Sequence, residues 1–230
     1  DTYEKAFIGA PSLYPSIAVV DPELMLSVPA GFTAFQGFDA LFHSIEGYIA
    51  NGANLMSDMY ALTAVENLAK YLPRAVKDGG DLEARTHVAF ANTLSGVVMC
   101  LTLITSEHGM EHALSAYHPN LPHGAGLIMI SRAYFSYFVR NHACDERFIR
   151  LARTMGMPEA DKPEDFLTAL VRLQEACGVV GLKMSDYGIA FDEAEKFMRN
   201  AREVMGVMFT SDRVQMTDAD IVRIYEESWR

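Results

Sequence analysis

The sequence predicts an all-α fold, a domain of about eight or nine helices preceded by one short strand. Three observations indicate this. Apolar residues recur at the helical period through most of the chain after about residue 33. Neither a glycine-rich dinucleotide motif nor a phosphate-binding loop occurs, and no strands alternate with helices after residue 30. Four of the nine prolines lie in the first 30 residues, so the start of the chain differs from the rest.

The predicted strand lies at about 16–20. The run Ile17-Ala18-Val19-Val20 is short and rich in β-branched residues, which favours a strand. Asp21-Pro22 ends it, because the residue before a proline avoids the helical region. One strand cannot form a sheet, so its partners lie elsewhere or outside this chain.

Later helices are predicted where apolar residues follow one face at the helical period. Pro73 is expected to stop the first of them. Two helix starts carry capping patterns, Asp192 with Glu195 and Thr217 with Asp220. We expect the thirteen Met and thirteen Phe to fill a helical core rather than to form a cofactor site. The predicted segments are 60–72, 84–103, 145–155, 166–177 and 194–208.

Charge and composition exclude several classes of partner. The chain has 19 Lys and Arg against 30 Asp and Glu, a net charge of −11, so nucleic acid and anionic membranes are poor partners. No uncharged apolar stretch reaches the roughly 18 residues of a membrane-spanning helix. The three cysteines are far apart and suggest no disulfide framework, and no signal peptide opens the chain. A cytoplasmic location is therefore expected.

Histidines form the most informative cluster. Four of the seven lie within sixteen residues, His108, His112, His118 and His123. His108 and His112 are four apart, as are Asp39 and His43, so each pair shares one face of a helix. Carboxylate and imidazole suit a divalent ion such as Fe²⁺, Zn²⁺, Co²⁺ or Mn²⁺.

Several of these features also have a purely structural explanation. An isolated Asp-x-x-x-His pair is usually a surface or helix-capping feature, whereas four histidines in sixteen residues are less ordinary. His123 is expected in a Pro-His-Gly loop that aims it at the site. His118, before Pro119, is interpreted as a loop residue, and His87 and His142 as surface residues.

Ordered motifs in this chain resemble those of the iron-containing (group III) alcohol dehydrogenases. Among them are Gly37-Phe38-Asp39-Ala40-Leu41-Phe42-His43, His108-Gly109-Met110-Glu111-His112 and Pro122-His123-Gly124. The match runs in consistent order through most of residues 5–155 and weakens over the last 75 residues. Each motif is modest alone, and together they are specific.

The resemblance implies a two-part fold, an α/β domain that binds the dinucleotide followed by a helical domain that carries the metal. Residues 1–30 would be the end of the cofactor domain, with its last strand and a linker, and residues 31–230 the helical metal-binding catalytic domain. The remainder of the α/β domain would then be missing from this chain, and the piece alone would be inactive.

The resemblance also assigns residues. It implies that Asp39, His43, His108 and His123 bind the metal. His112 would be the non-ligand histidine near the nicotinamide, a free histidine of near-neutral pKa that relays a proton to solvent. Lys5 would contact the ribose on the nicotinamide side of the cofactor.

Two departures from the family pattern concern the second histidine motif. His108 and His123 are one residue further apart than is common in the family, which leaves His118 as a less favoured competitor. Glu111 stands where a small residue is more common, and it could support a ligand histidine from behind.

The activity implied by the resemblance is reversible, NAD(P)-linked oxidation of an alcohol to an aldehyde or ketone. Iron is the family's metal by name, while three histidines and an aspartate also accept zinc. The resemblance is compatible with either NAD or NADP as cofactor, with a small-molecule alcohol or aldehyde as substrate and with a homo-oligomer. Two other hypotheses stay open, a hydrolytic metalloenzyme that needs no nicotinamide and a helical domain that binds metal without catalysis of its own.

Overall fold

The computed structural model describes residues 2–230, and over that range it contains nine α-helices and no strand. The predicted all-α fold class is thereby confirmed. None of the helices in this range combines the length and apolar character needed to cross a membrane. The α-helices are α1 (Ala30–Ile49), α2 (Leu55–Lys77), α3 (Leu82–Leu101), α4 (Glu107–Tyr117), α5 (His123–Arg140), α6 (Asp145–Thr154), α7 (Glu164–Ala176), α8 (Ala194–Met205) and α9 (Asp218–Ser228).

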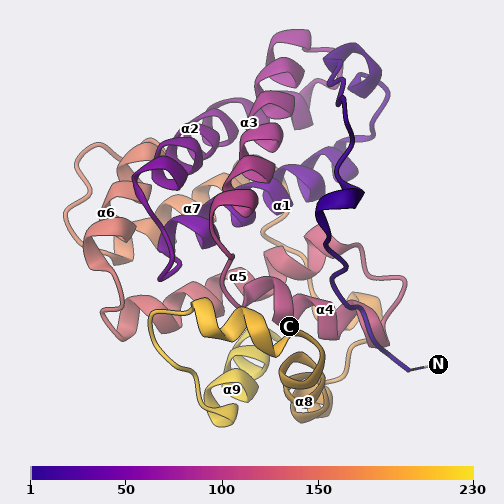
Figure 1. Cartoon of the computed structure of the whole chain (residues 1–230), viewed down its shortest axis with the longest axis vertical. Coiled ribbons are helices and arrows are strands. Elements are labelled where there is room, and N and C mark those ends of the chain that lie inside the picture. Colours follow the sequence, from indigo (N-terminus) through magenta and orange to yellow (C-terminus); the bar gives the residue numbers. More distant parts are fainter. Residues whose placement is uncertain (1) are drawn as a thin grey trace.

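Helix α1 lies at the centre of the molecule. It packs against α2 and α3, which form a hairpin in the upper part of Figure 1, and also against α5. Helix α4 lies against α5 and α8, and α9 packs on α5 and α8 at the opposite end from the hairpin. Helices α6 and α7 pair with each other at one side. Helix α5 thus joins α1 to α4, the two helices that carry most of the candidate site residues.

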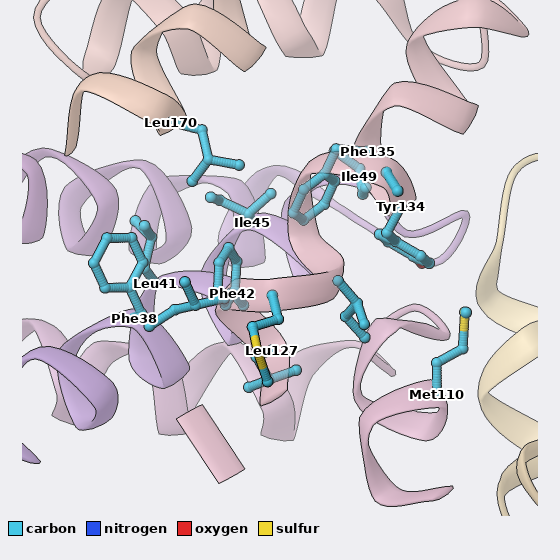
Figure 2. Close-up of a cluster of buried hydrophobic side chains, with 14 of the residues drawn as sticks. Phe38, Leu41, Phe42, Ile45, Ile49, Met110, Leu127, Tyr134, Phe135 and Leu170 are labelled. Atoms are coloured by element: carbon cyan, nitrogen blue, oxygen red, sulfur yellow. The ribbon is translucent and has the colours of Figure 1, made fainter. Parts of the chain in front are cut away.

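The core is built from the apolar face of α1 and its neighbours. Phe42 and Ile45 of α1 lie close to Phe135 of α5 and Leu170 of α7 in Figure 2, with Phe38 one turn earlier on α1, and all five are completely buried. Burial of each such side chain contributes about 1.5–3 kcal/mol relative to exposure. The expectation that Phe residues fill the core is met at these positions, and the packing holds α1 and α5 in fixed register behind the site.

Helix α5 approaches α1 very closely at Gly124. A Cβ atom at this position would overlap the carbonyl oxygen of Phe35 in α1, so only glycine fits. The close approach brings the start of α5, and therefore His123, over the face of α1 that carries Asp39 and His43.

One of the two predicted capping patterns is confirmed and the other is wrong. Thr217 caps α9, because its hydroxyl accepts the Asp220 N–H at 3.2 Å and Asp220 accepts the Thr217 N–H at 2.9 Å. Asp192 does not cap α8, which begins only at Ala194. A 3₁₀ turn over Phe191–Glu193 precedes the helix, and Glu193 rather than Glu195 accepts a backbone N–H, from Ala190 at 2.8 Å.

Pro73 does not end its helix, contrary to the prediction. Helix α2 continues to Lys77 with Pro73 inside its last turns. Proline removes the hydrogen bond of its own missing N–H, and its ring crowds the carbonyl group one turn earlier. Leu72 and Ala75 on either side are completely buried, so packing against the rest of the domain maintains the helix past the proline.

The predicted strand at about 16–20 is not formed within the described part of the chain. These residues adopt no regular secondary structure, and the side chains of Ile17 and Val19 are 82% and 86% exposed. A strand needs a neighbour to pair with, and none of residues 2–230 supplies one. The segment before α1 includes only short 3₁₀ turns, at Pro11–Leu13 and Pro22–Met25, and runs along one side of the molecule (Figure 1). The division at residue 30 stays a prediction.

Candidate metal centre

Four predicted ligands converge from three helices. Asp39 and His43 lie one turn apart on α1, His108 is in the first turn of α4, and His123 is the first residue of α5. The oxygen Oδ1 of Asp39 lies 3.1 Å from Nε2 of His108, 3.4 Å from Nε2 of His123 and 3.3 Å from Nδ1 of His43. The expectation that a loop carries His123 is wrong, since Pro122 starts the helix directly before it.

The two separations from Asp39 Oδ1 to Nε2 of His108 and His123 suit a metal ion. Zn²⁺ and similar ions hold nitrogen and oxygen ligands at about 2.0–2.2 Å, so ligand atoms on a tetrahedral ion lie about 3.4 Å from one another. Donor atoms of Asp39, His43 and His108 all lie within 4.8 Å of one another. The donor set of imidazoles and one carboxylate also matches the ions that the sequence indicated.

Each of the three histidines has an acceptor close to its Nδ1 atom. His43 Nδ1 donates to the Asp39 carbonyl oxygen at 2.9 Å. His108 Nδ1 contacts the Glu46 carboxylate, and His123 Nδ1 contacts the Glu111 carboxylate. A histidine that donates from Nδ1 keeps the lone pair of Nε2 for a metal, and ligand histidines in metalloproteins are commonly held in this way.

Glu46 is a site residue that the sequence reasoning missed. It is completely buried in α1, contacts His108 and accepts a hydrogen bond from the Thr105 hydroxyl at 3.2 Å. Its position, seven residues after Asp39 and three after His43, places it on the same face of α1. That spacing was visible, but the contact with His108 depends on how α4 packs.

The charges at this centre shift one another's pKa values. Burial alone would raise the pKa of Asp39, but hydrogen bonds from His108 and His123 outweigh it and hold that pKa well below its usual range. Burial lowers the pKa of His43 to about 3. Burial would also lower the pKa of His108, but Glu46 and Asp39 overcome it and raise this pKa to about 10. A cation bound here must therefore displace a proton from His108.

Lys5 and His112 lie side by side next to these ligands. His112 Nδ1 donates to the Lys5 carbonyl oxygen at 2.8 Å, which leaves its Nε2 as a proton acceptor. Burial, followed by the nearby Lys5 ammonium, lowers the pKa of His112 to about 4. The expected near-neutral pKa is therefore not found, and the imidazole is neutral at pH 7.

The side chain of Lys5 points into the helical domain. Its Nζ lies 3.0 Å from Glu111 Oε2, 2.8 Å from Ser115 Oγ and 2.9 Å from His123 Nδ1. Glu111, His112 and His123 also form a group with donor atoms within 4.8 Å of one another. The ammonium group of Lys5 already supplies a positive charge to that group, which disfavours a second cation there.

The other histidines lie outside the centre. His118 Nε2 is 3.0 Å from the Glu193 carboxylate, and His142 is exposed beside Asp145. His87 is half-buried, with its ring stacked at 3.7 Å on Tyr71, so its interpretation as a surface residue is wrong.

An apolar pocket of about 460 Å³ lies along the segment that follows Lys5. Ala6, the neighbour of Lys5, is part of its wall, and the rest of the wall comes from the segment before α1, from α3 and the loop after it, and from the end of α8 and the 3₁₀ turn that follows it. The larger apolar side chains in that wall are Phe7, Met99, Ile104, Met205 and Met208.

The chain is similar in sequence to alcohol dehydrogenases over most of its length. The protein-family model described as "Fe-containing alcohol dehydrogenase family, C-terminal" matches residues 33–229 of the chain. The NAD-dependent methanol dehydrogenase of Bacillus methanolicus is 30% identical over 203 residues, 82% of this chain and 50% of that protein. The 1,3-propanediol dehydrogenase of Klebsiella pneumoniae is 31% identical over 185 residues, 75% of this chain and 47% of that protein.

Solved structures agree with this similarity. An archaeal halo-thermophilic alcohol dehydrogenase from a Red Sea brine pool matches with a TM-score of 0.93 at 27% identity, over 99% of this chain and 58% of that one. A 1,3-propanediol oxidoreductase matches with a TM-score of 0.86 at 28% identity, over 94% of this chain and 56% of that one.

Fold and sequence together define a helical domain of the alcohol dehydrogenase type. The chain belongs to the iron-containing alcohol dehydrogenase family, whose C-terminal part it matches. It spans about half the length of the curated relatives it matches.

Proposed function

We propose that this chain supplies the metal-binding part of an NAD(P)-linked alcohol dehydrogenase that interconverts an alcohol and an aldehyde or ketone by hydride transfer. Asp39, His43, His108 and His123 hold a divalent cation, either Fe²⁺ or Zn²⁺. The observation that carries the proposal is the shared anchoring of three histidines through Nδ1, together with one Asp39 oxygen that lies 3.1 Å from Nε2 of His108 and 3.4 Å from Nε2 of His123.

The bound cation would supply Lewis acidity, which lowers the pKa of an alcohol hydroxyl and polarises a carbonyl. The residues of the chain do the rest. His112 keeps a proton on Nδ1 through its bond to the Lys5 carbonyl and offers Nε2 to accept the hydroxyl proton of the substrate. The neutral state of His112 at pH 7, which its lowered pKa implies, is the state that this role needs.

The apolar pocket that includes Ala6, the neighbour of Lys5, supports a small alcohol as the substrate class. Its walls would accept the hydrocarbon part of such an alcohol. Two relatives, a methanol dehydrogenase and a 1,3-propanediol dehydrogenase, are named for small alcohols, which fits this substrate class.

Nicotinamide use is proposed from the name of the Bacillus methanolicus relative and from the family. The half-length match to the relatives supports the view that the dinucleotide is bound mainly by an α/β part outside these 230 residues. In that arrangement Lys5 would approach the cofactor ribose after leaving its present contacts with Glu111 and His123.

The test is an assay of the protein as its gene encodes it, including any residues before residue 1, loaded with Fe²⁺ or Zn²⁺. We expect alcohol-dependent reduction of NAD⁺ or NADP⁺ that is lost in His123→Ala. The 230-residue chain alone should bind the metal and produce no NAD(P)H. Hydrolysis of an ester or amide without nicotinamide would instead favour a hydrolytic metalloenzyme and contradict the proposal.

A further inference from the structure

Two groups face Nδ1 of the proposed ligand His123, and one is a hydrogen-bond acceptor while the other is a donor. The Glu111 carboxylate contacts this nitrogen directly, and the Lys5 ammonium lies 2.9 Å from it. A carboxylate can only accept a hydrogen bond, whereas an ammonium group can only donate one. Glu111 therefore favours a proton on Nδ1, while Lys5 favours a lone pair there.

The outcome of this competition decides whether His123 can bind a metal. A neutral imidazole carries one proton, so a proton on Nδ1 leaves the lone pair on Nε2, the atom that lies 3.4 Å from Asp39 Oδ1. If Lys5 prevailed, the proton would sit on Nε2 and block metal binding at that atom.

The surrounding residues fix Glu111 where its carboxylate can accept a hydrogen bond from Nδ1 of His123. It is completely buried in α4, and its Oε2 also accepts a hydrogen bond from Lys5 at 3.0 Å. On the α5 side, a Cβ atom at residue 126 would lie 2.7 Å from Glu111 Oε1, so glycine at this position leaves the space that the carboxylate occupies. The Ser115 hydroxyl accepts from Lys5 at 2.8 Å and holds the ammonium beside the carboxylate.

We propose that Glu111 is a positioning residue that sets the tautomer of His123 against the influence of Lys5, and so presents Nε2 to the metal. Glu46 makes the corresponding contact with His108, so two of the three histidines are held by buried carboxylates. This inference rests on the proposed metal site, and its test separates the two.

The experiment measures Zn²⁺ affinity of the 230-residue chain by competition with a chromophoric chelator. Glu111→Gln keeps the size of the side chain but removes the charge, and we expect about a 10- to 100-fold loss of affinity. Lys5→Met alone should change affinity by less than about threefold, because Glu111 still holds the proton on Nδ1. The double variant should regain part of the loss, because the competing ammonium is gone.

Glu107→Gln is the matched control. Glu107 lies one turn earlier on α4, is equally buried, and has no hydrogen-bond partner among the described residues. The Glu107→Gln variant should bind Zn²⁺ with the same affinity as the unsubstituted chain. Circular dichroism checks that each variant folds, and the visible spectrum of the Co²⁺-loaded Glu111→Gln chain should approach that of His123→Ala.

The outcomes separate the claims. Zn²⁺ affinity of Glu111→Gln within about twofold of the unsubstituted chain would overturn the inference and leave the metal site standing. If Glu111→Gln weakens Zn²⁺ binding equally with and without Lys5→Met, Lys5 does not compete with Glu111 for Nδ1 of His123. Failure of the unsubstituted chain to bind Zn²⁺ or Co²⁺ would contradict the proposed metal site and the inference with it.

Discussion

The three histidines of the proposed centre differ in what holds each Nδ1 atom. His43 uses a carbonyl oxygen of its own helix, whereas His108 and His123 use the buried carboxylates of Glu46 and Glu111. Burial of a carboxylate is costly unless it is paired, so these two glutamates depend on the imidazoles as much as the imidazoles depend on them.

Residue patterns predicted part of this centre. The spacing of Asp39 and His43 and the density of histidines after residue 107 indicated a metal site, and the family resemblance selected four ligands. Glu46 was missed because its partner His108 is 62 residues away, and no local rule connects them. The lowered pKa of His112 could not be predicted either, since it arises from burial and from a lysine 107 residues earlier.

The buried carboxyl group of Asp212 should make the stability of the chain depend on pH. Asp212 accepts hydrogen bonds from the Ser106 N–H at 3.0 Å and from its hydroxyl at 2.7 Å, yet burial raises the pKa of Asp212 to about 7. The folded chain thus holds this proton more tightly than the unfolded chain. Stability from this group is greatest below about pH 4 and falls as the pH rises to about 7, by roughly 4 kcal/mol in total.

Asp212→Asn should remove this dependence. Urea denaturation at pH 4.5, 6 and 8 should show a smaller fall in the free energy of unfolding for the variant than for the unsubstituted chain. Asp192→Asn, at an exposed position, serves as the control and should retain the full fall. Parallel pH profiles for Asp212→Asn and the unsubstituted chain would refute the account.

At the scale of elements, helical periodicity identified helices but not all of their ends. The segments predicted at 84–103, 145–155 and 166–177 correspond to α3, α6 and α7 within a few residues. Pro73 was misjudged because burial of its neighbours outweighs one missing hydrogen bond. The N-cap of α8 was placed one residue too early, at Asp192 instead of Glu193, because a 3₁₀ turn comes first. The local sequence could not show whether residues 16–20 form a strand, because a strand needs a partner from another part of a chain.

The crossing of α1 and α5 gives a prediction about the element that carries His123. Gly124→Ala places a Cβ against the Phe35 carbonyl and should push α5 away from α1. We expect a loss of about 1–3 kcal/mol in the free energy of unfolding, together with weaker Zn²⁺ binding, because His123 moves with the helix. Chemical denaturation and chelator competition measure the two effects.

Gly96→Ala is the control for the Gly124 experiment. Gly96 lies within α3, and a Cβ atom there would meet no described atom within 4 Å. This substitution should stabilise the chain by about 0.5–1 kcal/mol, because alanine loses less entropy in a helix than glycine. Equal effects of the two substitutions would contradict the close approach of α1 and α5.

For the molecule as a whole, metal binding and folding should be coupled. The proposed ligands come from α1, α4 and α5, so a cation that binds them would stabilise only the folded arrangement of all three. At a free Zn²⁺ concentration of 100 times the dissociation constant, the expected gain is about 2.7 kcal/mol.

The pH dependence of that gain follows from His108. Its pKa of about 10 in the metal-free chain means that Zn²⁺ must displace a proton at pH 6 and at pH 8 alike. Affinity should therefore rise with pH, by about tenfold per unit for each proton displaced. Thermal unfolding with and without Zn²⁺ should show a larger increase in Tm at pH 8 than at pH 6, and a larger increase at pH 6 would contradict this linkage.

Metal analysis is the most direct test of whether one metal ion is held by Asp39, His43, His108 and His123. The chain and its single alanine variants at these positions are loaded with Co²⁺, dialysed and analysed for metal content, with His142→Ala as the surface-histidine control. We predict about one ion per chain for the unsubstituted protein and the control, and loss of most of it in each ligand variant. Full metal content in His123→Ala would contradict the ligand set.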